Sequence, residues 1–455
     1  MSTANPPTLH TQAGPQALDE LVQEDRVHRS MYTETPIFER EMERIFGGTW
    51  TFVAHESEIP NKNDFVRKTL GLRPIIVTRD RSNDIYVLMN RCTHRGATVC
   101  RLESGNARRF SCPYHNWTFE NNGEVATVPL DDAYGPETDL SSLRLGRARA
   151  DSYRGFIFAT LNPEMPPLEE HLGNAARLID QWLDRWPGAK LVVRNGGHRM
   201  IYKGNWKLVY DNAHDAYHAG FSHASQLRMR TDRYGGGADF KGIIANLDKT
   251  GLTANDLGNG NTFVNVGDRP GRVAQRSPDE TAWSQAAPMP GQQAYEKIIR
   301  ERLGADADKA LDVATGSAMN LNIFPNLLLI GNQIQVIDPI SVNETHLNWY
   351  ATTLDAPDLP DEVNSIRMRL QEDFPSFGEP DDLANFEECH LGLEAVPEME
   401  WVNTSRHLTT GMEVRDENGV VTGVVTDELC IRAFWRRWKE LMQDETKLDV
   451  TGVGR

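Results

Sequence analysis

Two short pairs of metal-binding side chains constrain this chain more than any other feature. Cys92 and His94 form a Cys-x-His pair, and after an interval of 17 residues Cys112 and His115 form a Cys-x2-His pair. The whole chain has only five cysteines in 455 residues, so cysteines beside histidines do not reflect a general richness in cysteine. Thiolates and imidazoles bind zinc and iron in proteins. The pattern therefore predicts a metal site with four protein ligands.

The spacing separates a structural zinc site from a binuclear iron cluster. Zinc sites of cysteine and histidine commonly combine a Cys-x2-4-Cys half with a His-x3-5-His half. Here each half supplies one sulfur and one nitrogen. Two such loops suit a cluster in which one iron takes both thiolates and the other both imidazoles, as in the Rieske [2Fe–2S] centre, whose neutral histidines raise its reduction potential. We expect this cluster at Cys92, His94, Cys112 and His115, with structural zinc as the alternative.

The residues around these pairs resemble a known domain. The stretch "CTHRGATVC…FSCPYHNW" is similar to the Rieske domain of ring-hydroxylating oxygenase large subunits. Short β-rich runs separated by turn residues predict a small all-β domain over residues 45–160. Residues 1–44 and 161–455 mix helical and strand patterns. The expected fold class is α+β, in which a small Rieske domain joins a larger α+β catalytic domain with an antiparallel sheet and an iron-binding helix.

Composition and charge exclude several function classes. The formal net charge of −17 disfavours a nucleic-acid partner, because phosphate binding needs basic patches. No apolar run is long enough to cross a bilayer, and the N-terminus shows no secretory signal. A low, odd number of cysteines argues against a disulfide framework. We therefore expect a cytoplasmic protein that binds neither membrane nor nucleic acid.

A second group of possible metal ligands lies in residues 204–225, "GNWKLVYDNAHDAYHAGFSHAS". Three histidines and two aspartates fall within 13 residues there: Asp211, His214, Asp215, His218 and His223. On a regular helix Asp215 and His218 share one face, whereas His218 and His223 lie about 140° apart. These two histidines can share a metal only if the helix bends or ends between them, and Gly220 is placed to allow it.

Two imidazoles leave a ferrous ion without a charge-balancing ligand. Non-haem iron sites that keep positions open for dioxygen combine two histidines with one carboxylate. The stretch "FGEPDDLANFEECHLG", residues 377–392, supplies several candidates for a third ligand: Asp381, Asp382, Glu387, Glu388 and His390.

Both stretches resemble one subgroup of oxygenases. "NWKLVYDNAHDAYHAGFSH" is similar to the iron-binding helix of benzoate, toluate and anthranilate dioxygenase large subunits, and "EPDDLANFEECHLG" to their later acidic segment. The resemblance implies that His218, His223 and Asp382 bind one mononuclear Fe(II) and that Asp215 bridges the two metal centres. Asp381 stays an alternative third ligand. The likeness covers most of residues 27–400 and is weaker in the tail that follows.

The resemblance also implies a reaction and partners. It points to an oxygenase component that uses O2 and two electrons, most simply for cis-dihydroxylation of a small, benzoate-like aromatic acid. Monohydroxylation of an aromatic such as salicylate is the alternative, and an electron carrier with a docking domain is the alternative from another class. No GxGxxG motif follows a strand, so electrons from NADH are expected through a separate reductase, directly or through a ferredoxin. The family further implies a small β subunit in an α3β3 hexamer, or an α3 ring, in which His115 of one subunit approaches Asp215 of the next.

Overall fold

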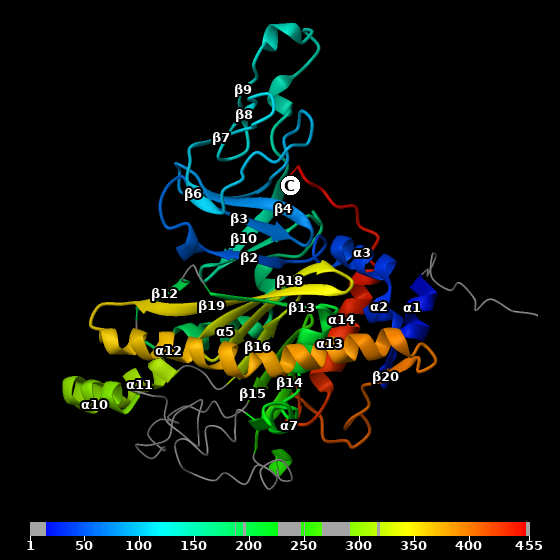
Figure 1. Cartoon of the computed structure of the whole chain (residues 1–455), viewed down its shortest axis with the longest axis vertical. Helices are drawn as coiled ribbons and strands as arrows, with labels where there is room; N and C mark the ends of the chain where they lie inside the picture. The colour runs from blue at the N-terminus through cyan, green and yellow to red at the C-terminus, as the bar shows by residue number, and fades with distance from the viewer. Residues whose placement is uncertain are drawn as a thin grey trace, which may run out of the picture.

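The chain folds into a small β domain placed on top of a larger α+β domain (Figure 1). The computed structural model describes residues 15–186, 188–193, 197–225, 247–249, 251–265, 292–315 and 319–451. None of the helices in these ranges has the length and apolar character that a membrane span requires.

The small domain is built on an antiparallel sheet of seven strands. Their order is β2 (Thr51–His55), β11 (Phe156–Thr160), β10 (Arg147–Tyr153), β5 (Ile85–Met89), β4 (Arg73–Arg79), β3 (Asp64–Leu70) and β6 (Ser104–Asn106). Ile75 and Val77 belong to one buried cluster and Ile76 to another, because successive side chains of β4 point to opposite faces. The sheet is therefore covered on both sides. The second cluster packs against a three-stranded sheet of β7 (Arg109–Ser111), β8 (Thr118–Glu120) and β9 (Val125–Thr127).

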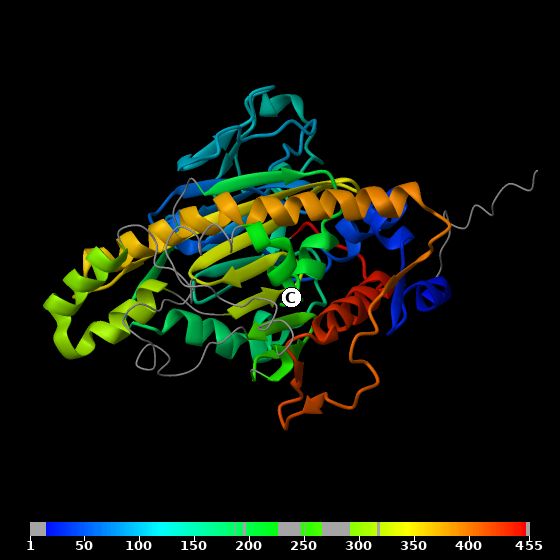
Figure 2. The same cartoon turned by 60° about the horizontal axis from the view of Figure 1, so that its bottom comes forward.

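The larger domain contains a ten-stranded antiparallel sheet. Its order is β12 (Lys190–Val193), β19 (Glu344–Asp355), β18 (Gln333–Ser341), β17 (Leu327–Ile330), β16 (Met319–Ile323), β15 (Asn261–Asn265), β14 (Thr253–Gly258), β22 (Val421–Val424) and β21 (Val414–Arg415), and β13 (His198–Tyr202) also pairs with β19. Helices α12 (Asp361–Phe377) and α13 (Glu379–Ala395) run along one side of this sheet. Helices α5 (Asn174–Leu183) and α14 (Leu429–Gln443) lie on the other side (Figure 2).

A buried carboxylate joins three helices behind the predicted iron segment. Glu41, on α3 (Thr35–Arg44), is fully buried and accepts hydrogen bonds from the indole N–H groups of Trp206 (2.8 Å) and Trp438 (2.7 Å). It also pairs with Lys207 Nζ at 2.5 Å, at the start of α6 (Lys207–Ala213). A buried charge is tolerated only when it is paired and hydrogen-bonded, as Glu41 is here. These bonds fix α6 relative to α3 and α14.

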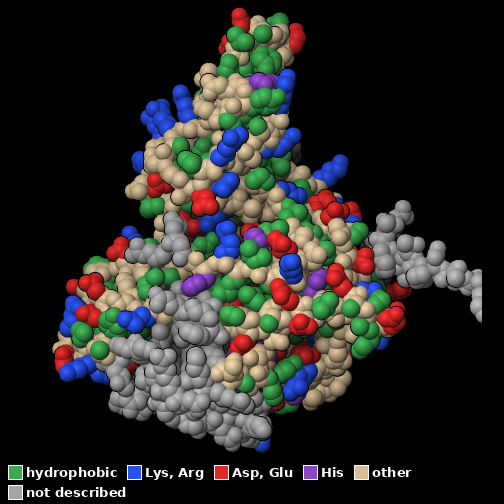
Figure 3. Space-filling view, in the orientation of Figure 1, with side chains coloured by type: hydrophobic (Ala, Val, Ile, Leu, Met, Phe, Trp, Pro, Cys, Tyr) green, Lys and Arg blue, Asp and Glu red, His purple; other side chains and the backbone are tan. Residues whose placement is uncertain are grey.

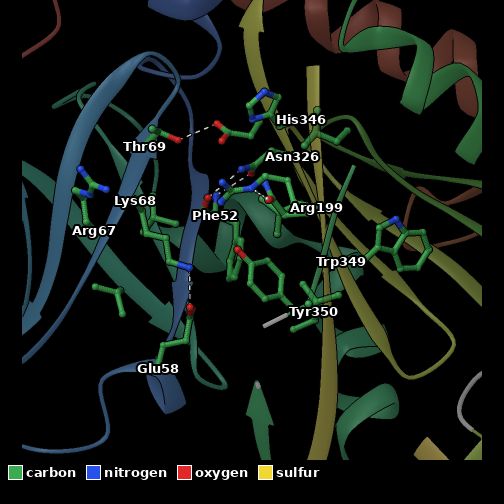
Figure 4. Close-up of a pocket in the computed structure, with 18 of the residues that line it drawn as sticks. Phe52, Glu58, Arg67, Lys68, Thr69, Arg199, Asn326, His346, Trp349 and Tyr350 are labelled. Carbon is green, nitrogen blue, oxygen red and sulfur yellow. Dashed lines mark hydrogen bonds and ion pairs between the residues drawn. The ribbon is translucent and has the colours of Figure 1, made fainter. Parts of the chain in front are cut away.

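A cleft of about 640 Å³, lined by both polar and apolar side chains, lies between the two domains (Figure 4). The Asn326 side chain crosses from the large domain and bonds both the N–H and the carbonyl of Phe52, at 3.0 and 2.9 Å. At another wall of the cleft Thr69 donates to Asp338 at 2.8 Å. The chain also returns to the small domain after α14, where the N–H of Arg147 donates to the carbonyl of Val450 at 2.6 Å. The two domains are thus connected at several points.

Candidate metal centres

The two Cys/His loops of the small domain share one backbone design. In the first loop, the carbonyl of Cys92 accepts a hydrogen bond from the N–H of Gly96, four residues later (2.9 Å). The N–H of Cys92 donates to the carbonyl of Ala97, five residues later (2.8 Å). The second loop repeats both bonds from Cys112, at 3.0 and 2.8 Å. The fourth position is Gly96 in one loop and Asn116 in the other, with φ of 78° and 58°. Glycine and asparagine tolerate this left-handed conformation best, so the residue types at these positions suit the two loops.

The side chains of the two loops point toward one another. The His94 and His115 ring centroids lie 4.5 Å apart, and the His94 ring stacks on Trp117 at 5.0 Å. Cys92 and Cys112 are both buried, and both are free thiols. His94 Nδ1 is buried, and no group in the described parts of the chain forms a hydrogen bond with it. A buried nitrogen lone pair without a donor is costly in a folded protein unless a metal occupies it, so the loops fit a metal centre.

The arrangement fits a cluster better than a single zinc ion. The described residues contain one group of three or more ligands gathered closely enough for one ion, and it does not include the Cys/His loops. Tetrahedral zinc would need all four ligand atoms around one point. Burial raises the pKa of the Cys92 thiol, so its thiolate form needs the positive charge of a metal. The loops therefore suit two metal ions, each taking one type of ligand.

The surface beside these loops is basic although the chain is acidic overall. Arg91 and Arg95 flank the first loop, and Arg101 and Arg108 follow; all four are exposed and none has an ion pair within the described parts of the chain. Lys and Arg side chains are visible along the small domain in Figure 3. Surface charge of this kind steers the approach of oppositely charged proteins.

The predicted iron segment is not one helix. Helix α6 ends at Ala213, and a shorter helix, α7 (Ala219–Ser222), follows after an irregular turn. The turn forms because Asp215 Oδ1 accepts the N–H groups of Tyr217 (2.6 Å) and His218 (2.9 Å), competing with the backbone carbonyls for these donors. As expected, the helix ends between the two histidines, at Ser222. It does not break at Gly220, which lies inside α7.

The large domain brings together the three residues implied as iron ligands. His218 and His223 flank α7, and Asp382 lies in the first turn of α13. Their ligand atoms form the close group mentioned above, all within 4.8 Å of one another. His218 Nε2 lies 3.9 Å from Asp382 Oδ1, and His223 Nε2 lies 3.4 Å from Asp382 Oδ2. Two imidazoles and one carboxylate that face one point fit a ferrous ion with open positions.

Asp215 lies on the outer side of this group. Its Oδ1 is 3.5 Å from His218 Nδ1, the ring nitrogen that faces away from Asp382. Burial by itself lowers the pKa of His218, but the hydrogen bond and charge of Asp215 and the charge of Asp382 outweigh it, and the net pKa is raised. A carboxylate behind a metal-binding histidine fixes its orientation and tautomer.

Other candidates from the sequence do not join the site. Asp211 is half-buried, accepts a hydrogen bond from Tyr32 (2.8 Å), and has its pKa raised to about 7 by burial. His214 packs against the Tyr210 and Phe434 rings. On α13, Glu387 accepts the N–H of Lys203, Glu388 is exposed, and His390 lies 3.4 Å from Glu394.

One residue of the site was not singled out from the sequence. Asn212 Nδ2 donates to Asp382 Oδ1 at 3.0 Å and so holds the carboxylate from the end of α6. Asn212 precedes Asp215 by three residues, a spacing that places two side chains on the same side of a regular helix. This spacing could have identified Asn212 as a neighbour of the site from the sequence.

Comparisons with known proteins agree with these two centres. Residues 49–143 match the family described as Rieske [2Fe-2S] domain, and residues 183–444 match the ring hydroxylating alpha subunit (catalytic domain). The large subunit of 2-halobenzoate 1,2-dioxygenase from Burkholderia cepacia is 34% identical over 89% of this chain and 87% of its own length. The chain belongs to the ring-hydroxylating alpha-subunit family.

Further relatives align over most of their length, and a solved one shares the fold. The toluate 1,2-dioxygenase alpha subunit of Pseudomonas putida is 33% identical over 85% of this chain and 84% of its own. A solved structure of naphthalene 1,2-dioxygenase with indole bound superposes with a TM-score of 0.76 at 27% identity, covering 94% of both chains. As a ring-hydroxylating alpha subunit, the chain has a Rieske [2Fe–2S] domain and a catalytic domain that binds mononuclear iron in this family. The α+β fold class and the oxygenase class expected from the sequence are confirmed.

Proposed function

We propose that this alpha subunit adds both atoms of O2 to the ring of a small aromatic acid and forms a cis-diol. Two of its relatives are named for substituted benzoates, 2-halobenzoate and toluate. When bound, the cluster supplies an electron at a raised potential and the ferrous ion supplies the site of dioxygen activation. Arene, O2, two electrons and two protons together balance the diol.

His218, His223 and Asp382 hold the iron in this proposal. The observation that carries it is their convergence from α7 and α13 in a chain that also holds the paired Cys/His loops. Asp382 offers one oxygen toward each histidine, and Asn212 keeps it in that orientation. These three residues would hold the ion, and a site with three protein ligands would leave positions for dioxygen.

Asp215 connects the two centres across a subunit boundary. In one chain the cluster loops lie in the upper domain and α7 in the lower part of the large domain, so the two centres of one chain are far apart in the view of Figure 1. A cluster held by a second copy would serve the iron of this chain, with His115 of that copy beside Asp215 of this one. Such a contact is heterologous, and a closed ring of three alpha subunits satisfies it.

Other proteins complete the proposed system. A separate reductase delivers electrons from NADH, directly or through a ferredoxin. A small β subunit joins the alpha subunits in the hexamer. The exposed arginines beside the cluster loops suit an acidic electron-transfer partner.

The test is a product screen under ¹⁸O2. Purified alpha subunit, with its reductase and NADH, is given benzoate, an alkylbenzoate, salicylate and naphthalene. The proposal expects a cis-diol from a benzoate, with both oxygens labelled. A single labelled hydroxyl would indicate monohydroxylation, turnover of naphthalene alone would reject the aromatic-acid assignment, and cluster reduction without any product would favour the electron carrier.

A further inference from the structure

Each of the two histidines proposed as iron ligands lies between two carboxylates. Their inner Nε2 atoms face Asp382, at 3.9 Å for His218 and 3.4 Å for His223. Their outer Nδ1 atoms each face a different aspartate. For His218 it is Asp215, at 3.5 Å, and for His223 it is Asp381, whose Oδ2 lies 3.7 Å away.

We propose that Asp381 is a positioning residue that holds His223 through its outer nitrogen and is not itself an iron ligand. The proposal rests on the iron site proposed above. A neutral imidazole carries its proton on one nitrogen only. A carboxylate beside Nδ1 keeps the proton there, leaves the Nε2 lone pair for the metal and increases the basicity of the ring.

Helix geometry explains why neighbouring aspartates have different roles. Consecutive residues of an α-helix point about 100° apart, so Asp381 and Asp382 cannot both face one ion from the same turn of α13. Asp382 is the more enclosed, with 4% of its side chain exposed against 32% for Asp381. Asp381 instead lies on the outer side, where Ser225 Oγ also donates to its Oδ2 at 3.5 Å.

Asp381 can be replaced with little disturbance of the backbone. Asp215 also accepts two backbone N–H groups that shape the turn before α7, so its replacement changes the fold locally. Among the described residues, the polar partners of the Asp381 carboxylate are two side chains, those of His223 and Ser225. A change in iron binding after its replacement therefore reports on His223.

The experiment measures Fe(II) affinity of the full-length protein by competition with a chelator. Asp381→Ala is expected to weaken iron binding by about 10–100-fold, the usual effect of removing a carboxylate behind a metal-binding histidine. Asp381→Asn keeps an acceptor but loses the charge, so its affinity should lie in between, and Asp381→Glu should restore most of it. Glu388→Gln is the matched control, because it removes one exposed carboxylate from the same helix.

A spectroscopic readout separates positioning from a general loss of structure. The EPR signal of the ferrous–nitrosyl complex should change its rhombicity in Asp381→Ala, while the Rieske signal and the thermal unfolding curve stay as in the control. If Asp381→Ala binds iron as tightly as Glu388→Gln and gives the same nitrosyl signal, the proposal is wrong.

Other outcomes separate this inference from the proposed function. If Asp381→Asn binds no iron while Asp382→Asn retains it, Asp381 is the third ligand, and both this inference and the proposed ligand set fail. If Asp381→Ala shows the expected weaker binding but the unsubstituted enzyme oxidises no aromatic acid, the positioning role stands and the proposed substrate class fails.

Discussion

The two metal-binding regions are built in opposite ways. The cluster ligands lie within residues 92–115, in two loops with the same backbone hydrogen bonds. The iron group takes two histidines from the ends of α7 and a carboxylate from α13, more than 150 residues later in the chain. A site formed by local backbone geometry can be identified from spacing alone. A site formed by packing of distant helices cannot.

The two regions also differ in their exposure. In the small domain His94 and His115 are half-buried, and Tyr114 between the ligands of the second loop is 61% exposed. In the large domain His223 and Asp382 have only 6% and 4% of their side chains exposed. An exposed ligand edge suits exchange of electrons with another protein, whereas an enclosed ion suits oxygen chemistry away from water.

The sharpest test of this comparison removes one centre at a time. His223→Ala is expected to lose the mononuclear iron and to lower product formation by more than about 100-fold, since even an outer partner is worth about 10–100-fold. Its Rieske EPR signal should persist. Cys112→Ala should give the reverse, with no cluster signal and retained iron by metal analysis. Loss of both metals in either variant would show that the two regions do not fold independently.

Coupling between the regions is tested at Asp215. Asp215→Asn keeps an oxygen that can accept the Tyr217 and His218 N–H groups, but it removes the charge behind His218. We expect both metals to remain bound and turnover to be abolished, because the variant cuts the coupling between the two centres. Rapid-mixing experiments should show that the reduced cluster stays reduced when substrate and O2 are present. Normal cluster oxidation in this variant would reject the bridge.

Local spacing was enough to predict the two cluster loops. Cys92 and His94 lie in one loop and Cys112 and His115 in the other, and the two loops repeat the same backbone hydrogen bonds. The pairing of β2 with β11, which lie about 100 residues apart, could not be predicted because no local pattern specifies the partner of a strand.

The iron region shows where sequence reasoning stops. The spacing of His218 and His223 predicted that a helix bends or ends between them. It did not predict the earlier interruption at Asp215, whose side chain accepts backbone N–H groups. The choice of Asp382 over Asp381 came from family resemblance, because both have the right chemistry and only the packing of α13 on α7 distinguishes them. The domain limits at residues 45 and 160 and the subunit composition stay predictions.

The iron region also contains a histidine that its site does not use. Both ring nitrogens of His214 are buried and have no hydrogen-bond partner among the described residues, and burial lowers the pKa of His214 to about 3. We expect His214→Leu to raise the free energy of unfolding at neutral pH by about 1–3 kcal/mol, because it removes unsatisfied polar atoms.

The pH dependence of this variant follows from the same shift. Below pH 6.5 the unfolded chain protonates His214, while the folded chain keeps it neutral until about pH 3. Protonation of His214 therefore does not affect the free energy of unfolding above pH 6.5. As the pH falls from 6.5 toward 3, the unfolded chain gains a proton that the folded chain does not, and the folded protein loses stability. Urea unfolding at pH 7.5 and pH 5 should show a larger advantage of the leucine variant at pH 5, by about 2 kcal/mol. An equal difference at both pH values would mean that His214 is not held neutral.

The smallest expected effect tests whether the two cluster loops are equivalent. Gly96 and Asn116 occupy the same left-handed position, with φ of 78° and 58°. Gly96→Ala places a Cβ in this conformation and is expected to cost about 1–2 kcal/mol, whereas Asn116→Gly relieves strain and should leave stability unchanged or slightly higher. Chemical unfolding, followed by the visible absorbance of the cluster, measures the stability of both variants.

A steric clash does not account for the expected loss in Gly96→Ala. The added Cβ would lie 3.4 Å from Arg91 Nε, at the end of a flexible side chain. A large loss in Asn116→Gly with none in Gly96→Ala would mean that side-chain contacts, and not the shared backbone conformation, hold the loops in place.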